Sequence, residues 1–271
     1  LRACEAALSA DEARLFLELT RWVAEPVRSF FLALTLRFEV DRLKDILRVW
    51  LDGVARGGDM AGHAAYLERE PLVNVLDTDA MLVAADASQV AAVVSKTPYG
   101  ALLASELPSA VERGNLFELE LSLDNFYFSS AYAAAAKLSL HDRAIARRAL
   151  DMDADAQNAD RLNRFVVWYG MDATEAARYL LSFGSASGSL SSRVASMAGG
   201  AAEGKSGGEL LRAAFRSMAL TEARRLLGGY PFSVGIPLAY GTLRREETRV
   251  VTAILNAKYY GLSEERIREA L

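Results

Sequence analysis

Residues 246–271 read EETRVVTAILNAKYYGLSEERIREAL, and this stretch decides how we interpret the rest of the chain. Its valine, isoleucine and leucine residues recur with the 3.6-residue period of an amphipathic helix. Gly261 suits the left-handed conformation that closes a helix, and Ser263 is a suitable N-cap for a second helix. The stretch therefore predicts two helices that are joined by a glycine turn.

The same skeleton occurs at two earlier places in the chain. In each copy an acidic residue precedes an Arg or Asn by nine positions and a Gly by fourteen or fifteen. The three sets are Glu39, Arg48 and Gly53; Asp155, Arg164 and Gly170; and Glu247, Asn256 and Gly261. Repetition at roughly one hundred residues indicates an internally repeated chain with units longer than those of usual solenoids. We therefore expect an all-α fold of three similar helical bundles.

The composition restricts the class of protein. Of 271 residues, 52% are hydrophobic and 24% are charged, which is typical of a folded globular chain. The net charge of −4 does not favour a nucleic-acid-binding surface. Cys4 is the single cysteine, so the chain has no disulfide framework and no thiolate metal cluster. No apolar run approaches the roughly eighteen residues of a membrane-spanning helix, so we expect no direct membrane span.

Helix-breaking residues suggest where the bundles begin and end. Residues 1–62 are interpreted as the remainder of a first bundle that is truncated at its N-terminus, since Leu1 already lies in a helical pattern. Residues 63–182 form the predicted second bundle, and residues 183–271 the third. The third includes a Gly- and Ser-rich loop at 183–208, a composition typical of flexible connections.

One dipeptide invites a metal-site hypothesis. His141-Asp142 resembles the pair with which HD-type phosphohydrolases hold a divalent metal, and His63 is the one other histidine that could join it. The alternative is that Ser139 to Asp142 begins a helix, with the carboxylate near the positive end of the helix dipole. The second interpretation is favoured, because so short a match often arises by chance.

Two further patterns have both a chemical and a structural interpretation. Glu118, Glu120 and Asp124 could form a paired-carboxylate site, but such acids more often face solvent or bind Arg across a bundle. Gly199, followed by Gly204-Lys205-Ser206, satisfies the spacing of a phosphate-binding loop. No strand is predicted before it, and that motif depends on a strand–loop–helix context, so an accidental match is favoured.

The remaining residue types do not supply an enzyme site. Two histidines and one cysteine do not allow a nucleophile–base–acid triad, so no catalytic residue, metal ligand or cofactor is predicted. Aromatic residues of the repeats are expected to pack in the core or between domains. They are Trp50, Trp168, Tyr169, Tyr259 and Tyr260.

Four motifs, taken in order, resemble the C-type subunit of the prokaryotic V/A-type rotary ATPases, the relative of the d-type subunit of the eukaryotic vacuolar enzyme. The motifs are the helix Glu39 to Gly53; the turn Thr97-Pro98-Tyr99-Gly100 with Gly114 to Phe128; Asp155 to Asn158 leading to Gly170; and Pro231 to Gly235 with Leu238-Ala239-Tyr240 and Glu247 to Leu262. The sequence departs from that family at Arg42 and Val250, where Asn is common, and at Asn256, where Arg is common. The loop after Phe183 also replaces a segment that is commonly helical.

The resemblance implies a pseudo-threefold funnel of three bundles and a mechanical role. Such a protein is a non-catalytic rotor adaptor that joins the central stalk, subunits D and F, to the membrane ring of proteolipid subunits. It transmits torque for proton or sodium transport and lies on the cytoplasmic side as a peripheral part of the membrane complex. The alternatives are a helical-repeat interaction scaffold and a metal- or nucleotide-dependent helical hydrolase.

Overall fold

The computed structural model describes residues 2–56, 64–65, 67, 69–185 and 207–270. All regular secondary structure in these residues is helical, which confirms the all-α prediction. The chain divides into two compact units. The first unit comprises Leu1–Leu116 and Tyr240–Leu271, and the second comprises Phe117–Ala239. The division into three bundles at 1–62, 63–182 and 183–271 stays a prediction.

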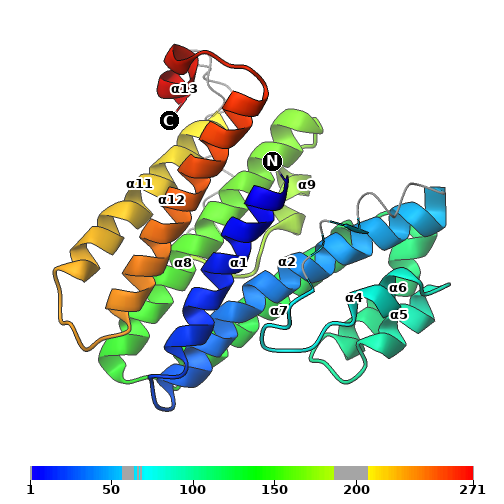
Figure 1. Ribbon diagram of the computed structural model, residues 1–271, viewed down its shortest axis with the longest axis horizontal. Helices are drawn as coiled ribbons and strands as arrows, with labels where there is room; N and C mark the ends of the chain where they lie inside the picture. Colours follow the sequence, from blue (N-terminus) through cyan, green and yellow to red (C-terminus); the bar gives the residue numbers. More distant parts are fainter. Residues whose placement is uncertain (1, 57–63, 66, 68, 186–206, 271) are drawn as a thin grey trace. The chain divides into compact units, whose positions relative to one another are not determined.

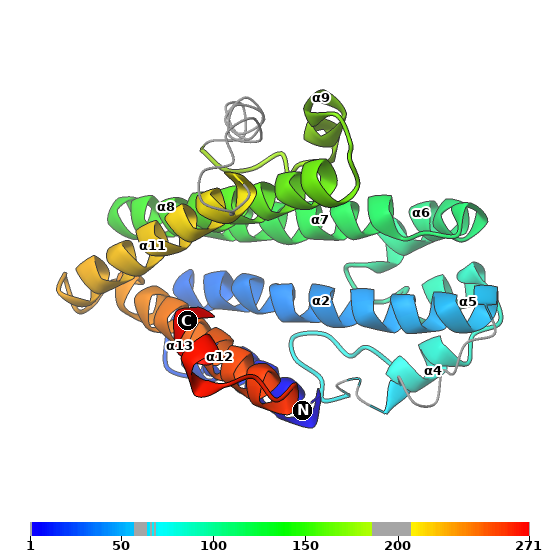
Figure 2. The ribbon, with the colours of Figure 1, turned by 90° about the horizontal axis from the view of Figure 1, so that it is seen from above.

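The first unit is built on a pair of helices at its N-terminal end (Figure 1). α1 and α2 pack against each other, and the short helices α4 to α6 follow, with α4 in contact with α2 (Figure 2). α12 begins in the second unit and continues into the first, where α13 ends the described chain. The helices are α1 (Arg2–Leu19), α2 (Val27–Arg56), α4 (Thr78–Leu82), α5 (Ala87–Val93), α6 (Gly100–Arg113), α12 (Gly235–Tyr259) and α13 (Glu264–Ala270).

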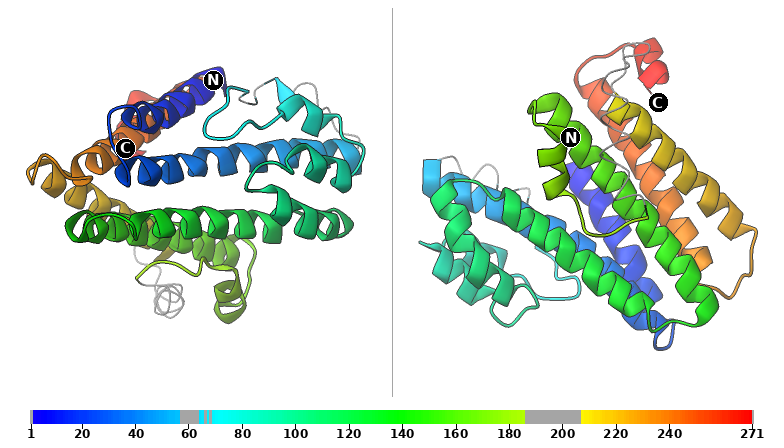
Figure 3. Two further views of the ribbon diagram at one scale, coloured as in Figure 1. Left: turned by 90° about the horizontal axis from the view of Figure 1, so that it is seen from below. Right: turned by 180° about the vertical axis from the view of Figure 1, so that it is seen from behind.

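In the second unit α8 packs against both α7 and α11 (Figure 3). The C-terminus of α7 leads directly into α8, and Val234, after α11, donates its N–H to Asp142 at the start of α8 over 3.0 Å. Both neighbours are therefore antiparallel to α8. The elements are α7 (Phe117–Ala135), α8 (Leu140–Asn163), the π-helical turn η1 (Arg164–Trp168), α9 (Ala173–Ala176), the 3-10 turn η2 (Ala177–Tyr179) and α11 (Gly207–Leu227).

Side-chain caps fix several helix starts. The carboxylate of Asp86 accepts the N–H of Gln89 over 2.9 Å, and the side chain of Gln89 accepts the N–H of Ala85 over 2.9 Å. This reciprocal pairing satisfies two N–H groups that have no partner inside the helix. Ser139 caps α8 by accepting the N–H of Asp142 over 3.2 Å, so the prediction that a helix begins there is confirmed.

The glycines of the three repeats differ in their role. Gly170 and Gly261 have φ angles of 63° and 71°. After α12 the N–H of Leu262 reaches the carbonyl of Ala257 over 2.9 Å, the bond that closes a helix around a left-handed glycine. Gly53 does not end a helix, because α2 continues to Arg56. Gly53 thus lies inside its helix, whereas Gly261 follows the last residues of α12.

Apolar side chains that are shielded from solvent form the interior of each unit. In the first unit these include Phe30, Phe31, Leu43, Ile46, Leu47, Trp50 and Met81. In the second they include Leu119, Leu123, Phe128, Ala131 and Leu162. Trp50 satisfies its one polar atom by donating Nε1–H to the carbonyl of Ala84 over 2.8 Å. Among the described helices none combines the length and apolar character that crossing a bilayer requires.

Candidate functional site

The acid of the first repeat, Glu39, holds two other segments against α2. Its side chain is fully buried and accepts hydrogen bonds from the N–H groups of Val73 and Asn74. The amide of Asn74 and the hydroxyl of Tyr99 each donate to it over 2.8 Å. A buried carboxylate is costly unless it is hydrogen-bonded, and here four donors surround it. Glu39 therefore fixes residues 73–74 and the N-terminus of α6 onto one helix.

Arg42 extends this arrangement by one helical turn. Residues three apart lie on the same face of a helix, and Arg42 donates to the carbonyl of Glu70. Glu39 and Arg42, with the segment 70–74 that they hold, are called the first clamp. The pKa of Tyr99 is raised far above its ordinary value, first because of burial and then because of the neighbouring Glu39 carboxylate.

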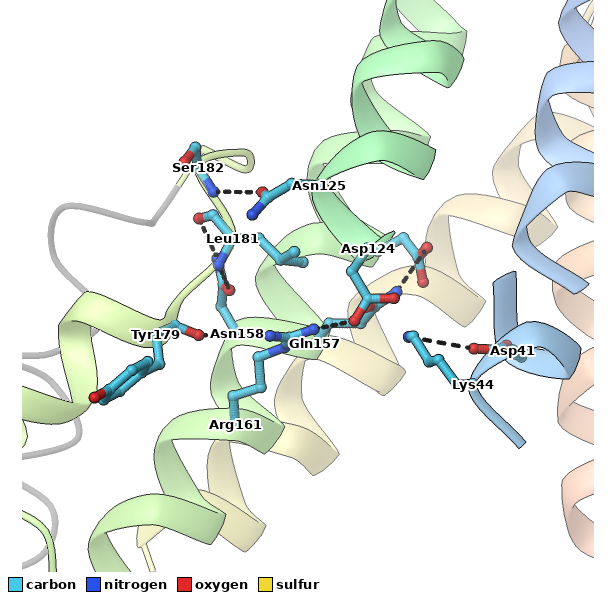
Figure 4. A network of polar contacts seen from close by, with 11 residues as sticks. Asp41, Lys44, Asp124, Asn125, Gln157, Asn158, Arg161, Tyr179, Leu181 and Ser182 are labelled. Atoms are coloured by element: carbon cyan, nitrogen blue, oxygen red, sulfur yellow. Dashed lines mark hydrogen bonds and ion pairs between the residues drawn. The ribbon is translucent and has the colours of Figure 1, made fainter. Parts of the chain in front are cut away.

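The acid of the second repeat belongs to a similar arrangement on α8. The carboxylate of Asp155, which is buried, accepts the N–H of Ser185 over 3.2 Å and its hydroxyl over 2.8 Å. Three residues later Asn158 accepts the N–H of Leu181 over 2.7 Å and donates to its carbonyl over 3.3 Å (Figure 4). Asn158 also donates to the carbonyl of Phe183 over 3.3 Å. Asp155 and Asn158, with the segment 181–185, are called the second clamp.

Further contacts reinforce the second clamp from α7. Ser182 donates its N–H to the amide oxygen of Asn125 over 3.4 Å (Figure 4). Asp124 forms an ion pair with Arg161, which also donates to the carbonyl of Tyr179 over 3.5 Å. Burial lowers the pKa of Arg161, while the Asp124 carboxylate acts in the opposite direction. Of the two interpretations of the acids on this helix, Asp124 follows the one in which an acid binds Arg across the bundle.

The third repeat has no clamp in the described part of the chain. The Glu247 side chain is 62% exposed and pairs with Arg244 on its own helix over 2.6 Å. The position three residues on is Val250, whose side chain cannot donate or accept a hydrogen bond. The acid is therefore present without either the burial or the polar neighbour that the first two copies have.

The second member of each repeat set has a separate local contact, and the three do not share a role. Arg48 pairs with Asp45 over 2.9 Å. The Arg164 guanidinium lies 5.7 Å from the centre of the Phe165 ring. The Asn256 amide donates to the carbonyl of Thr252 over 3.0 Å. These positions serve their own helices and do not build a common binding site.

The metal hypothesis gains no support from the residues that the structure describes. His141 is exposed, whereas Asp142 works as a helix-start residue that binds Ser139 and Val234. No group of three or more His, Cys, Asp and Glu side chains within the described ranges is arranged to hold a metal ion. His63 and the phosphate-loop pattern from Gly199 to Ser206 lie outside the described residues.

The aromatic residues of the repeats divide into two groups. Trp50 is fully buried, as expected of a core residue. Tyr169, Tyr259 and Tyr260 are mostly exposed, so packing in the core is wrong for them, and packing between domains stays a prediction. They lie one or two residues before Gly170 and Gly261. Trp168 lies in η1, and its side chain is outside the described part of the chain.

Comparison with protein families gives one match that spans nearly all of the chain. A family model described as the ATP synthase (C/AC39) subunit matches residues 1–270. The chain belongs to this family. The resemblance carried by the four sequence motifs is thereby confirmed, and both clamps lie within the matched region. A search of curated proteins found no match.

Local sequence patterns do not identify the clamp partners. They place Tyr99 in a turn and Asn158 in a motif, and they give Asn74 no role. The signal that could find the clamps is an acid followed three residues later by a second polar residue on a helix that is otherwise apolar on that face. Glu39 with Arg42 and Asp155 with Asn158 both fit that pattern, and Glu247 with Val250 does not.

Proposed function

We propose that this member of the ATP synthase family is a non-catalytic rotor adaptor, which joins the central stalk to the membrane ring of proteolipid subunits. The observation that carries the proposal is the family match over residues 1–270. The partners would be stalk subunits D and F on one face and the ring on another. Its place would be the cytoplasmic side of the membrane, as a peripheral part of a complex that transports protons or sodium ions.

The clamps support a mechanical role. A protein that transmits torque must resist deformation. Long helices would shift relative to one another under force if the segments that connect them were not bonded to the helices. In the first clamp Glu39 and Arg42 tie residues 70–74 to α2, and in the second Asp155 and Asn158 tie residues 181–185 to α8. Bonds to buried charged groups are stronger than neutral ones and cannot be exchanged for water without cost. Hydrogen bonds of this kind are what an adaptor would need to keep its connecting segments in place.

The three-bundle, pseudo-threefold funnel is part of the same proposal. It would provide a socket for the foot of the stalk and a base for the ring. The recurrence of the clamp on α2 and α8 supports an internal repeat, although the copy at Glu247 lacks it.

Binding of the full chain to purified D–F stalk, and separately to the rotor ring in detergent, tests the proposal. We expect sub-micromolar affinity for both, the range typical of specific interfaces. Asn158→Ala provides a matched variant, because it loosens the second clamp without removing a surface charge. It should bind with reduced affinity if the stalk or ring needs the rigid unit. Binding to neither partner by a folded chain would contradict the adaptor role and favour the interaction-scaffold alternative.

A further inference from the structure

The connection between α7 and α8 and the connection between α11 and α12 meet at one end of the second unit (Figure 3), and both carry exposed apolar side chains. Leu140 at the start of α8 is 82% exposed, and Phe232 between α11 and α12 is 84% exposed. Tyr230 and Leu227 are also exposed. These four residues are called the end patch. Exposed apolar side chains that lie on neighbouring segments mark a candidate contact surface.

The end patch is held in place by the fold. The N–H of Val234, two residues after Phe232, is bound to the Asp142 carboxylate over 3.0 Å, which ties the α11–α12 connection to the start of α8. The rings of Tyr230 and Phe232 meet edge to face with their centres 5.8 Å apart. Tyr230 and Phe232 are therefore presented together, on a connection that is fixed to the start of α8.

The charges around the end patch are mainly positive. Residues 136–143 and 222–234 contain four basic side chains, Lys137, Arg143, Arg224 and Arg225, and two acids. Glu222 and Arg225 pair with each other over 2.6 Å, Asp142 accepts the N–H of Val234, and the half-buried Arg143 donates to the carbonyl of Leu138 over 3.0 Å. The chain as a whole carries a net charge of −4, so this local excess of positive charge is a property of the end.

We propose that the end patch inserts into the interface of an anionic lipid bilayer. Exposed leucine and aromatic side chains next to Lys and Arg are the combination that interfacial membrane anchors use. The apolar groups enter the boundary between headgroups and acyl chains, and the cations approach the headgroup phosphates. Lys137 and Arg224, both exposed, supply positive charge on the two segments that carry Leu140 and Phe232. This inference does not depend on the adaptor role, because it requires no other protein.

Flotation of the full chain with lipid vesicles tests the inference. The chain should partition more strongly into phosphatidylcholine vesicles that contain phosphatidylglycerol than into phosphatidylcholine alone, and added salt should weaken the difference. Replacing Tyr230 and Phe232 together with Ser should weaken partitioning by about tenfold, since each ring loses apolar contact. Lys137→Gln should weaken partitioning into the anionic vesicles by about fivefold and leave the neutral vesicles unaffected.

A matched control separates the end patch from exposed aromatic residues in general. Tyr259 and Tyr260 lie at the opposite end of α12 and are 69% and 73% exposed, so replacing both with Ser should leave partitioning unchanged. Unchanged circular dichroism shows that a variant is folded. Absence of vesicle binding, or an equal loss in the Tyr259 and Tyr260 variant, overturns the inference. If the Tyr230 and Phe232 variant loses binding to the rotor ring but keeps its binding to vesicles, the inference is also overturned, and the end patch is then a protein-docking surface.

Discussion

Both clamps hold a connecting segment through hydrogen bonds to side chains of a helix, but different types of residue make these bonds in the two clamps. In the first unit the carboxylate of Glu39 gathers four donors, one of them the Tyr99 hydroxyl. In the second unit Asn158 exchanges bonds with Leu181 in both directions, and Asp155 accepts two bonds from Ser185. The residue three positions after the acid thus has a larger part in the second clamp than Arg42 has in the first, where it donates to the carbonyl of Glu70.

The third repeat has the spacing of acid and glycine but does not form a clamp among the contacts described. Glu247 has the same spacing to its glycine as Glu39, yet it is exposed and pairs along its own helix. The spacing places an acid on a helix face, but burial and a partner at the next turn make it a clamp.

The largest effect is expected from Glu39→Ala. This change leaves the buried Tyr99 hydroxyl and the N–H groups of Val73 and Asn74 without their acceptor, which should lower the free energy of unfolding by about 4 kcal/mol. Urea unfolding followed by circular dichroism measures it. Glu247→Ala is the matched control, and it should stay within about 0.5 kcal/mol because that side chain is exposed. Equal losses in the two variants would refute the distinction between them.

A smaller effect is expected from Asn158→Ala. The change should lower the free energy of unfolding by about 2 kcal/mol, because the buried N–H and carbonyl of Leu181 both lose a partner. Hydrogen exchange should show faster exchange at residues 181–185 and no change at residues 73–74, which belong to the first clamp. The control is Asn125→Ala, which removes a single bond of 3.4 Å to Ser182. If that control accelerates exchange as much as Asn158→Ala, then Asn158 is not the centre of the second clamp.

The first clamp also predicts a pH dependence. Burial and Glu39 raise the pKa of Tyr99 above its ordinary value of 10.0, so above that pH the unfolded chain releases a proton that the folded chain retains. The stability that Tyr99 contributes is therefore present below pH 10 and is lost as pH rises, by up to about 1.4 kcal/mol per pH unit. Tyr99→Phe should show a shallower loss in alkaline unfolding experiments. Identical slopes for the variant and the parent chain would show that the hydroxyl is not held against Glu39.

The smallest changes in stability are expected from replacing the repeat glycines Gly261 and Gly53 with Ala. Gly261→Ala should cost about 1 kcal/mol, because the φ of 71° disfavours any side chain although no atom blocks it. Gly53 lies inside α2, where Ala is preferred over Gly by up to about 1 kcal/mol, so Gly53→Ala should stabilise the chain. Thermal unfolding measures both. A loss at Gly53 equal to that at Gly261 would indicate that the two glycines have the same role after all.

The sequence predicts where helices lie better than it predicts which side chains contact one another. The period of Val250 to Leu255 and the stop at Gly261 place the C-terminal part of α12, because helix periodicity and glycine closure are local properties, whereas the helix itself begins earlier, at Gly235. α2 continues past Gly53 because an interior glycine only weakens a helix, and the burial of neighbours such as Trp50 stabilises it.

The clamp partners cannot be predicted from local pattern. Asn74 and Tyr99 reach Glu39 from positions 35 and 60 residues away, and such pairings depend on tertiary packing. The exposure of Tyr259 escapes prediction for the same reason, because a residue near a helix end has no neighbours that its own sequence can specify.

The most direct test of the adaptor role is a bridging measurement. The rotor ring is immobilised in detergent, and capture of the D–F stalk is recorded with and without the full chain. The account predicts that the stalk is retained when the chain is present and is washed away when it is absent. Retention of the stalk that does not depend on the chain, or binding of the chain to the ring without capture of the stalk, would contradict the proposal that this protein joins the two.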